Sequence, residues 1–344
     1  MKFTVGYQPR PGRDFLDAIL AHREALAEVY FPWGELPNGR GTLTGFPGEQ
    51  PFEVRRKLVE ALAEFSAAGI GLNLLLNGNC YGRRSQSRAL FQEIGDAVDW
   101  IRGRFGLASV TTTSPLIAKF LKTNFPEVEV RASVNMEIGT VQGMEYLADW
   151  FDGYYLKREL NRDFATLCEL RRWCDDNGKK LYCLANSGCL NFCSAHNFHD
   201  NLVAHEHEIA EMDNAYEFRG VCFDYLSKPE KRRNFLRDTN FIRPEDLPLY
   251  EPYFDAVKLA TRTNRNPVAV LEAYLAGRFS GNLPELLEPN HAERFYPAVI
   301  ENSRLPADFG RRVLHCRKNC AKCGYCAAAL EQSLVQLPTI GDEI

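Results

Sequence analysis

The sequence lacks any long apolar segment. Across its 344 residues, no uninterrupted apolar run approaches the roughly 20 residues that a transmembrane helix needs. The opening residues, MKFTVGYQPR, turn polar too soon to form the apolar stretch of a signal peptide. We therefore expect a protein without a membrane span that stays in the cytoplasm.

A strong charge of one sign is also missing. The 41 Lys and Arg residues nearly balance the 45 Asp and Glu residues, which gives a net charge of −4. This charge offers no overall attraction to nucleic acid, and the short basic runs at 231–233 and 311–312 fit a solvated surface. Charge alone therefore does not single out nucleic acid as a partner.

Several catalytic signatures are absent as well. The chain has no G-x-S-x-G nucleophile turn, no H-E-x-x-H zinc motif, and no G-x-G-x-x-G that opens a helix after a strand. No cysteine has the local context of the papain-like peptidases. These absences argue against the common serine, metallo- and cysteine peptidases and against dinucleotide binding.

What the sequence does contain is a regular alternation of short apolar runs and amphipathic stretches. Hydrophobic residues make up 45% of the chain, which is enough for a full core. Val54, Leu58, Leu62 and Phe65 recur at helical spacing, and Asn161 is expected to cap a helix over 164–174. Eight runs of strand character begin near Phe3, Ala27, Gly71, Ala108, Val128, Gly153, Lys180 and Phe254. The alternation predicts a (β/α)8 TIM-like barrel, ahead of a doubly wound open sheet.

Two segments depart from this alternation. Residues 187–252 are too many for a simple loop and predict a long excursion after strand seven. Little regular barrel is expected beyond residue 280. We therefore divide the chain into a barrel over 1–285, with its insertion at about 187–252, and a cysteine-rich C-terminal segment over 286–344.

A first group of cysteines surrounds the end of the seventh predicted strand. Cys183 lies in that strand, Cys189 and Cys193 follow it, and Cys222 comes further along the excursion. In the cytosol disulfides do not persist, and clustered cysteines are more often metal ligands or catalysts. Four thiolates so placed can meet on one 4Fe–4S cluster or one zinc ion. The alternative for Cys183 is a small buried side chain.

A second group lies near the C-terminus. Cys316, Cys320, Cys323 and Cys326 form a C-x3-C-x2-C-x2-C array. The first three match the spacing of radical S-adenosylmethionine enzymes, but those enzymes carry it after the first barrel strand. We predict a separate, closed metal site, with a second 4Fe–4S cluster as the preferred occupant and structural zinc as the alternative.

The histidines between the two groups do not form a recognised zinc motif. His205 and His207 are two residues apart and would face different sides of a helix. We interpret the run from 196 to 208, which holds four histidines, as a solvated helix.

These motifs resemble those of the collagenase-like peptidase family (peptidase U, number thirty-two). Residues 158–160 match its arginine-glutamate-leucine, and residues 258–262 correspond to its final strand, which runs from lysine to arginine. Cys183 with the Ser187-Gly188-Cys189 turn corresponds to its cysteine-containing strand. The match spans roughly residues 1–285. Members of this family include UbiU/UbiV-type oxygen-independent hydroxylases and several RNA hydroxylases.

The resemblance implies a (β/α)8 barrel with an oxygen-labile 4Fe–4S cluster at its rim, held by Cys189, Cys193 and Cys222. The chain has one residue fewer between its first two cysteines than the family usually has, and "SAHNFHDN" replaces an arginine-rich cysteine loop. The fourth ligand therefore stays open among Cys183, Cys80, His196 and His199.

Charged residues at the ends of two predicted strands are the candidate catalytic set. Because the carboxyl ends of barrel strands share one rim, side chains from these ends can converge. The fixed fork of arginine suits carboxylate or phosphate, while a glutamate can orient an arginine or act as a general base. A salt-bridge network at the barrel mouth is the alternative. The set is Arg158, Glu159, Lys258 and Arg262, with Asn135 and Asn186 as neutral donors.

The resemblance supplies the expected reaction. It implies an iron–sulfur enzyme similar to oxygen-independent hydroxylases, acting on an RNA base or a small aromatic acceptor in anaerobic metabolism. An anionic small molecule such as prephenate is the expected ligand, and another barrel protein is a candidate partner. The alternatives are a peptidase, as the family name says, and a non-catalytic iron–sulfur electron carrier or partner subunit.

Overall fold

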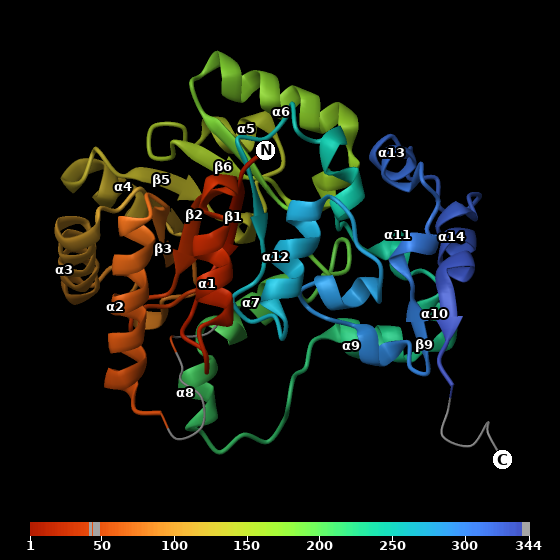
Figure 1. Cartoon of the computed structure of the whole chain (residues 1–344). Coiled ribbons are helices and arrows are strands. Elements are labelled where there is room, and N and C mark those ends of the chain that lie inside the picture. Colours follow the sequence, from red (N-terminus) through yellow and green to blue (C-terminus); the bar gives the residue numbers. More distant parts are fainter. Residues whose placement is uncertain (41–42, 44–48, 339–344) are drawn as a thin grey trace.

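The protein is a closed barrel of eight parallel strands in sequence order (Figure 1). The computed structural model describes residues 1–40, 43 and 49–338. The strands are β1 Phe3–Gly6, β2 Leu26–Phe31, β3 Gly71–Leu76, β4 Ser109–Thr112, β5 Glu129–Ala132, β6 Gly153–Tyr155, β7 Lys180–Leu184 and β8 Ala256–Leu259. All eight predicted strands are present, and the pairing of β1 with β8 closes the barrel. The predicted TIM-like fold is confirmed.

Helices cover the outside of the barrel. Their buried faces follow the apolar spacing of the sequence, so that Val54, Leu58, Leu62 and Phe65 of α2 are all buried. None of the described helices is long and apolar enough to cross a membrane. The helices that follow barrel strands are α1 Asp14–Ala21, α2 Pro51–Ala67, α3 Arg88–Phe105, α4 Pro115–Asn124, α5 Val141–Glu145, α6 Phe164–Asp176 and α12 Pro267–Ala276.

The start of α6 differs from the prediction. Asp163, not Asn161, is its N-cap, and the Asp163 carboxylate accepts a hydrogen bond from the backbone N–H of Thr166 at 3.3 Å. Asn161 is buried, and its Nδ2 donates to the backbone oxygens of Leu184 and Asn240. This side chain therefore ties the strand end to the excursion.

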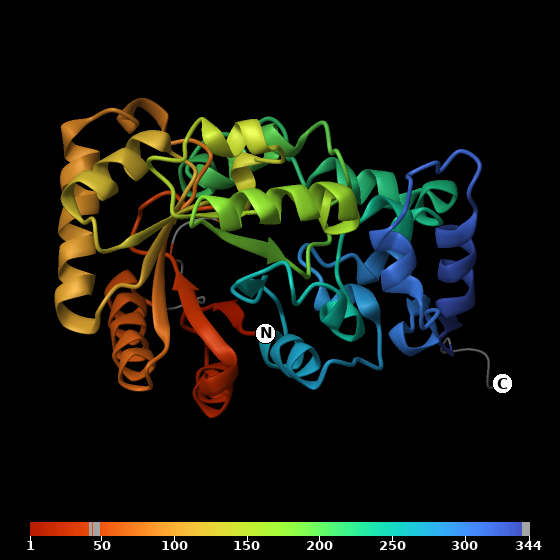
Figure 2. The ribbon, with the colours of Figure 1, turned by 90° about the horizontal axis from the view of Figure 1, so that it is seen from above.

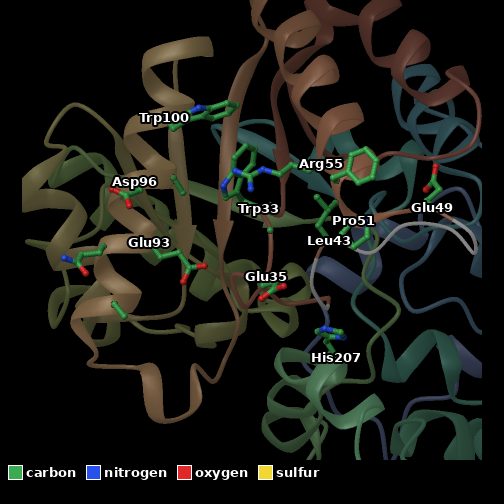
Figure 3. Close-up of a pocket in the computed structure, with 15 residues that line it drawn as sticks. Trp33, Glu35, Leu43, Glu49, Pro51, Arg55, Glu93, Asp96, Trp100 and His207 are labelled. Atoms are coloured by element: carbon green, nitrogen blue, oxygen red, sulfur yellow. The ribbon is translucent and has the colours of Figure 1, made fainter.

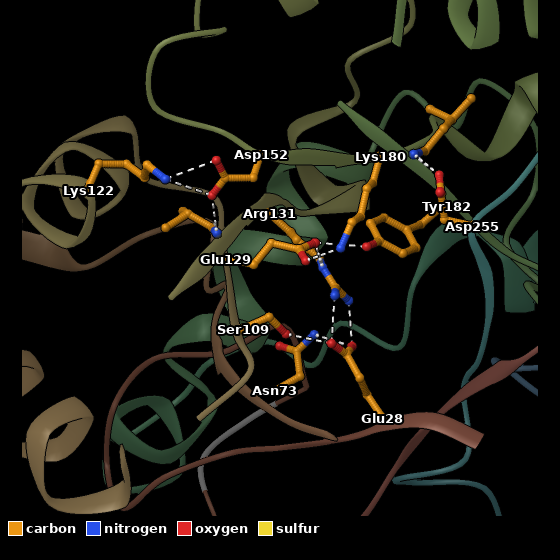
Figure 4. A network of polar contacts seen from close by, with 12 residues as sticks. Glu28, Asn73, Ser109, Lys122, Glu129, Arg131, Asp152, Lys180, Tyr182 and Asp255 are labelled. Carbon is orange, nitrogen blue, oxygen red and sulfur yellow. Dashed lines mark hydrogen bonds and ion pairs between the residues drawn. The ribbon is translucent and has the colours of Figure 1, made fainter. Parts of the chain in front are cut away.

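The amino end of the barrel interior is filled by a network of polar contacts (Figure 4). Arg131 donates to both carboxylate oxygens of Glu28, and both side chains are buried. Glu129 accepts hydrogen bonds from Arg131, Lys180 and Tyr182. Burial would raise the pKa of Glu129, but Arg131 and these donors outweigh it and lower the pKa to about 2. This end of the barrel is therefore closed by paired charges.

The predicted excursion runs from the end of β7 to the start of β8 and forms a layer of short helices beside the barrel (Figure 1). The C-terminal segment lies against it, and α14 packs on α11 and on β9 (Figure 2). β9 and β10 form a small antiparallel sheet that the sequence did not predict. These elements are α7 His196–Ala204, α8 Glu206–Ala210, α9 Val221–Ser227, α10 Pro229–Arg232, α11 Phe235–Asp238, β9 Ala298–Ile300, α13 Phe309–Leu314, α14 Tyr325–Ser333 and β10 Leu334–Gln336.

Candidate active site at the barrel mouth

A small pocket of about 60 Å³ opens at the carboxyl ends of the barrel strands. Tyr30 of β2, Leu184 of β7 and Lys258 of β8 form part of its wall. The other lining residues are Gly39, Arg40, Leu75, Asn77, Val134, Asn135, Arg158, Ala260, Arg262, Thr263 and Glu288. Barrel enzymes place their chemistry at this end.

Positive charge dominates this pocket. Arg158, Lys258 and Arg262 are only 7%, 7% and 3% exposed. Arg40 joins them from the loop after β2 and is partly exposed. Among the described lining residues the acidic side chain is Glu288, whose carboxylate lies 4.0 Å from Arg40 Nε. Because buried charges are costly unless paired, this excess of cations favours an anion in the pocket.

The Lys258 ammonium lies between two tyrosine rings. Its Nζ is 4.1 Å from the ring centroid of Tyr30 and 5.0 Å from that of Tyr155. Within the described residues, no hydrogen bond or ion pair holds it. Burial, and then the charges of Arg262 and Arg158, lower the pKa of Lys258 to about 7. Lys258 therefore changes its protonation state near neutral pH.

The Tyr30 ring is fixed by a close approach to the backbone. A Cβ atom at Gly6 would lie 2.4 Å from this ring, so the glycine of β1 makes room for it. The Tyr30 hydroxyl donates to the backbone oxygen of Leu259 at 2.8 Å. The ring thus stays beside Lys258.

The two arginines keep donors free for a ligand. Arg262 Nη1 donates to Asn38 Oδ1 at 2.6 Å, and burial lowers the pKa of Arg262 to about 10. Arg158 Nη2 donates to Asn135 Oδ1 at 2.9 Å, while its Nε is buried and has no hydrogen-bond partner among the described residues. Since a guanidinium has five N–H donors, each arginine has more donors than these contacts use.

His196 supports Arg158 from the excursion. Its Nε2 lies 3.0 Å from Arg158 Nη1 and 3.2 Å from Asp200 Oδ2, and its Nδ1 lies 2.7 Å from Glu137 Oε1. Its side chain is 14% exposed. The prediction of a solvated helix is therefore wrong for His196, which faces the barrel mouth.

Glu159 lies outside the pocket. Its Oε1 accepts a hydrogen bond from the backbone N–H of Phe192 at 2.9 Å, and the side chain is buried. The structure therefore brings together Arg158, Lys258 and Arg262 of the predicted set, whereas Glu159 holds the loop that carries the first cysteines.

Residues 286–291 hold the same loop from its other side. The Gly188 N–H donates to the backbone oxygen of Glu288 at 2.9 Å. A Cβ atom at position 188 would lie 2.1 Å from the Pro289 oxygen, so only glycine fits there. His291 Nε2 donates to the Gly188 oxygen at 3.2 Å. This contact also places Glu288 in the pocket wall.

Three cysteines of the first group lie near one another. Cys222, in α9, is buried, whereas Cys189 and Cys193 are partly exposed. Burial, and then repulsion from the other two thiols, raise the pKa of Cys222 to about 11. All eleven cysteines are free thiols.

Cys183 is separate from these three. It is fully buried in the apolar layer outside the barrel strands, while its neighbours Tyr182 and Leu184 face the barrel interior. Burial alone raises the pKa of Cys183, with no contribution from another thiol. This position favours a core role for Cys183, and its assignment as a ligand stays a prediction.

Two alternatives for the fourth ligand border the group. A Cβ atom at Gly220 would lie 3.5 Å from both Cys222 Sγ and His199 Cε1. Cys80 is partly exposed in the loop after β3, and the adjacent Asn79 donates to Asp200 of α7 at 3.4 Å. Both alternatives remain open.

The four C-terminal cysteines line one recess of about 350 Å³ beside α11. Burial raises the pKa of Cys326, Arg162 opposes this, and the other three thiols raise it further. Cys316, Cys320 and Cys323 are exposed. The predicted array is thus a single cluster of thiols.

Zinc and a 4Fe–4S cluster place different demands on the arrangement of the two cysteine groups. In the described residues, no three His, Cys, Asp or Glu side chains form a group that could hold a metal ion. A zinc ion needs its donors at about 2.0–2.3 Å from one point, whereas a 4Fe–4S cluster distributes its thiolates over four irons. Metal binding by either group, as a cluster or as zinc, therefore remains a prediction.

No family profile matches the chain. The uncharacterized protease MJ1657 of Methanocaldococcus jannaschii is 29% identical over 322 residues, which cover 89% of this chain and 88% of that protein. Among solved structures, the U32 peptidase Mk0906 aligns with a TM-score of 0.53 and 15% identity, over 75% of this chain and 91% of that one. The resemblance to the collagenase-like peptidase family is confirmed. The match to Mk0906 supports the fold alone.

Sequence reasoning missed two residues of the pocket. Arg40 lies in a loop with no motif, and Glu288 lies beyond the resemblance, which ends near residue 285. Neither residue had a local signal. The proximity of Glu288 to Ser187-Gly188-Cys189 depends on a tertiary contact across a hundred residues.

A larger cavity of about 1030 Å³ lies between α2, α3 and the loop after β2 (Figure 3). Trp33 and Trp100 form its aromatic wall, with ring centroids 5.2 Å apart. Glu35 and Asp96 line it but are exposed, so water screens their charges. The smaller pocket holds the desolvated charges and is the better candidate for chemistry.

Proposed function

We propose that this relative of the collagenase-like peptidases is a cytoplasmic enzyme that binds a carboxylate at the barrel mouth beside an iron–sulfur cluster. One observation carries the proposal: three buried cations, Arg158, Lys258 and Arg262, line one small pocket, and among the described lining residues the acidic side chain is Glu288. A bound carboxylate would offset their charge.

The first cysteine group would hold the cluster. Cys189, Cys193 and Cys222 supply three thiolates, and Cys80 or His199 would supply the fourth ligand. When bound, such a cluster supplies one-electron chemistry. Arg40 connects the two features, since Glu288 and Cys189 both raise its pKa against the effect of burial. Arg40 therefore responds to charge in the pocket wall and in the cysteine group.

The proposed reaction is an oxygen-independent hydroxylation of an RNA base or a small aromatic acceptor, with prephenate as a candidate oxygen source. The family resemblance is the support for this reaction. Prephenate is larger than a cavity of about 60 Å³, so only one carboxylate end would enter it. The acceptor would lie outside, toward the excursion.

The experiment compares the parent protein with Arg262→Gln and Glu159→Gln after anaerobic purification. Activity on candidate hydroxyl acceptors is measured with and without prephenate, and iron and sulfide are measured beside it. We expect Arg262→Gln to lose activity and keep its iron. Glu159→Gln changes a residue outside the pocket and keeps an oxygen that can accept from the Phe192 N–H, so it should keep its iron and its activity. Unchanged activity in Arg262→Gln would place the substrate elsewhere.

A peptidase is the second candidate, because both similar proteins carry that activity in their names. A peptidase needs an activated nucleophile or a metal-bound water. Anaerobically purified protein that cleaves a peptide library, and loses this activity in Arg262→Gln, would favour it.

The electron-carrier alternative draws on the surface position of Cys316, Cys320 and Cys323. A second cluster there could exchange electrons with a partner barrel protein. If the clusters are redox-active but their spectra do not change when any carboxylate is added, the electron-carrier alternative is favoured.

A further inference from the structure

Lys258 is the unpaired amine of the pocket. It projects from β8 into a cavity that it shares with Arg158 and Arg262, and it makes no hydrogen bond or ion pair with the described residues. Each arginine, by contrast, is anchored by an asparagine oxygen. The Lys258 nitrogen is therefore free to react with a ligand that the arginines position.

The surroundings of Lys258 disfavour its protonated form. Besides burial, the largest charge effects on it come from four cations, Arg262, Arg158, Arg131 and Arg40, while Glu288 is the acidic side chain of the described lining. Glu28 is already paired with Arg131. Burial raises the pKa of Tyr30 to about 12, so this neighbour stays uncharged at neutral pH. With a pKa of about 7, a substantial share of Lys258 is a neutral nucleophile at physiological pH.

We propose that Lys258 captures a small 2-oxo acid as a Schiff base, while Arg158 and Arg262 hold the carboxylate of that acid. This inference rests on the proposed carboxylate pocket and names its substrate class. A 2-oxo acid fits both features, because its carboxylate suits a guanidinium and its adjacent carbonyl is the partner of an amine.

The step balances without any further reactant. The lone pair of the neutral ε-amine forms a bond to the 2-oxo carbon, and the carbonyl π electrons move to oxygen. The two amine hydrogens leave with that oxygen as water, and the C=N bond forms in its place. Amine plus carbonyl therefore gives imine plus water, with no oxidation or reduction.

The size of the pocket selects a short ligand. One water molecule needs about 10–15 Å³ of cavity volume, and a water contributes one heavy atom. A cavity of about 60 Å³ therefore holds roughly four to six heavy atoms. Glyoxylate and pyruvate meet this limit. Prephenate carries a pyruvyl group, so the 2-oxo acid end of that larger molecule meets it as well.

The test is reductive trapping in the full-length, anaerobically purified protein. Pyruvate is added with sodium borohydride, which reduces an imine to a stable secondary amine, and the intact mass is measured. We expect one adduct per chain, with the mass of pyruvate less one oxygen, and peptide mapping should place it on Lys258. The trapping rate should rise with pH through about 7, where Lys258 loses its proton.

Matched variants control for folding and for chance labelling. Lys258→Arg keeps the positive charge and should lose the adduct, whereas Lys157→Arg, which changes a lysine outside the pocket lining, should keep it. Since peptide mapping of the parent protein identifies the lysine directly, the test does not depend on how Lys258→Arg folds. Label spread over several exposed lysines would overturn the proposal.

Lactate separates this inference from the proposed function. It has the carboxylate of pyruvate but no carbonyl. If lactate and pyruvate both bind but pyruvate gives no adduct, the Schiff base is wrong and the carboxylate pocket stands. If neither binds nor is trapped, both proposals fail.

Discussion

Arg131 holds the carboxylate of Glu28 with two hydrogen bonds inside the barrel, and the Nη2–Oε1 distance is 2.6 Å. Both side chains are buried, and Asn73 and Ser109 donate to the same carboxylate. Glu28 therefore compensates the charge of Arg131, which is one of the cations near Lys258. The polar interior of the barrel is thus neutral at its amino end and cationic at its mouth.

Glu28→Gln should destabilise the protein by about 3–5 kcal/mol, because it leaves the Arg131 charge with too little compensation. Urea unfolding of both proteins measures this cost. The matched control is Lys180→Gln, whose side chain is 51% exposed and pairs with Glu129. It should cost less than about 1 kcal/mol. Equal costs for the two variants would contradict the buried pair as a structural support.

His291 should make the free energy of unfolding depend on pH. Burial lowers the pKa of His291 from 6.5 to about 4, and the buried Nδ1 has no hydrogen-bond partner in the described part of the chain. Because the folded pKa is depressed, the contribution is fully present above pH 6.5 and is lost as the pH falls toward 4. It amounts to roughly 3 kcal/mol in total.

His291→Gln tests this pH dependence. The glutamine amide can still donate to the Gly188 oxygen but does not titrate in this range. Between pH 7 and 5, urea unfolding should show a shallower loss of stability in the variant than in the parent. Identical slopes would mean that His291 does not titrate as its burial implies.

The iron content should distinguish Cys189 from Cys183. Cys189→Ala should lose the iron of the first cluster, whereas Cys183→Ala should keep it and lose only about 1 kcal/mol of stability from a small cavity in the core. Iron analysis and absorption spectra of anaerobic preparations measure the first effect. If Cys183→Ala lost iron like Cys189→Ala, its position in the apolar layer would not exclude it as a ligand.

The C-terminal array should stabilise the tail through its metal. Cys320 is exposed, so Cys320→Ser removes a donor without disturbing the core. We expect lower metal content and faster amide hydrogen exchange over residues 310–336, with unchanged exchange in the barrel. A deletion is a poorer test, since Leu330 is buried in the core and would be lost with the tail. Unchanged metal and exchange would contradict a metal site here.

The barrel was predictable because each strand carries its own local signal. Runs such as GLNLLL and KLYCLA are short and apolar, and helices with regular spacing separate them. The resemblance located Arg158, Lys258 and Arg262, because the family places these residues at strand ends. Periodicity could not assign the face of β7 on which Cys183 lies. A strand of such a barrel is buried on both faces, so its sequence does not alternate between apolar and polar residues.

The rest of the site depends on contacts between distant segments. Glu288 reaches the pocket because residues near Pro289 pack on Gly188, and His196 turns inward because Glu137 and Asp200 flank it. Glu159 looked like a catalytic group by its position, but its carboxylate accepts a hydrogen bond from the Phe192 backbone and lies outside the pocket lining. Such contacts depend on the path of the excursion through space. Neighbouring residues in the sequence do not determine this path, so one sequence alone does not reveal the contacts.

The most direct test of the account is an equilibrium titration of the protein with pyruvate, in which isothermal calorimetry measures the binding. The parent should bind one pyruvate per chain, and Arg262→Gln should bind it roughly ten- to a hundredfold more weakly, since a hydrogen bond to a charged group contributes about 1.5–3 kcal/mol. Arg265→Gln, which changes an arginine that is 88% exposed, should bind like the parent. Equal affinity in all three proteins, or no saturable binding in the parent, would contradict the carboxylate pocket.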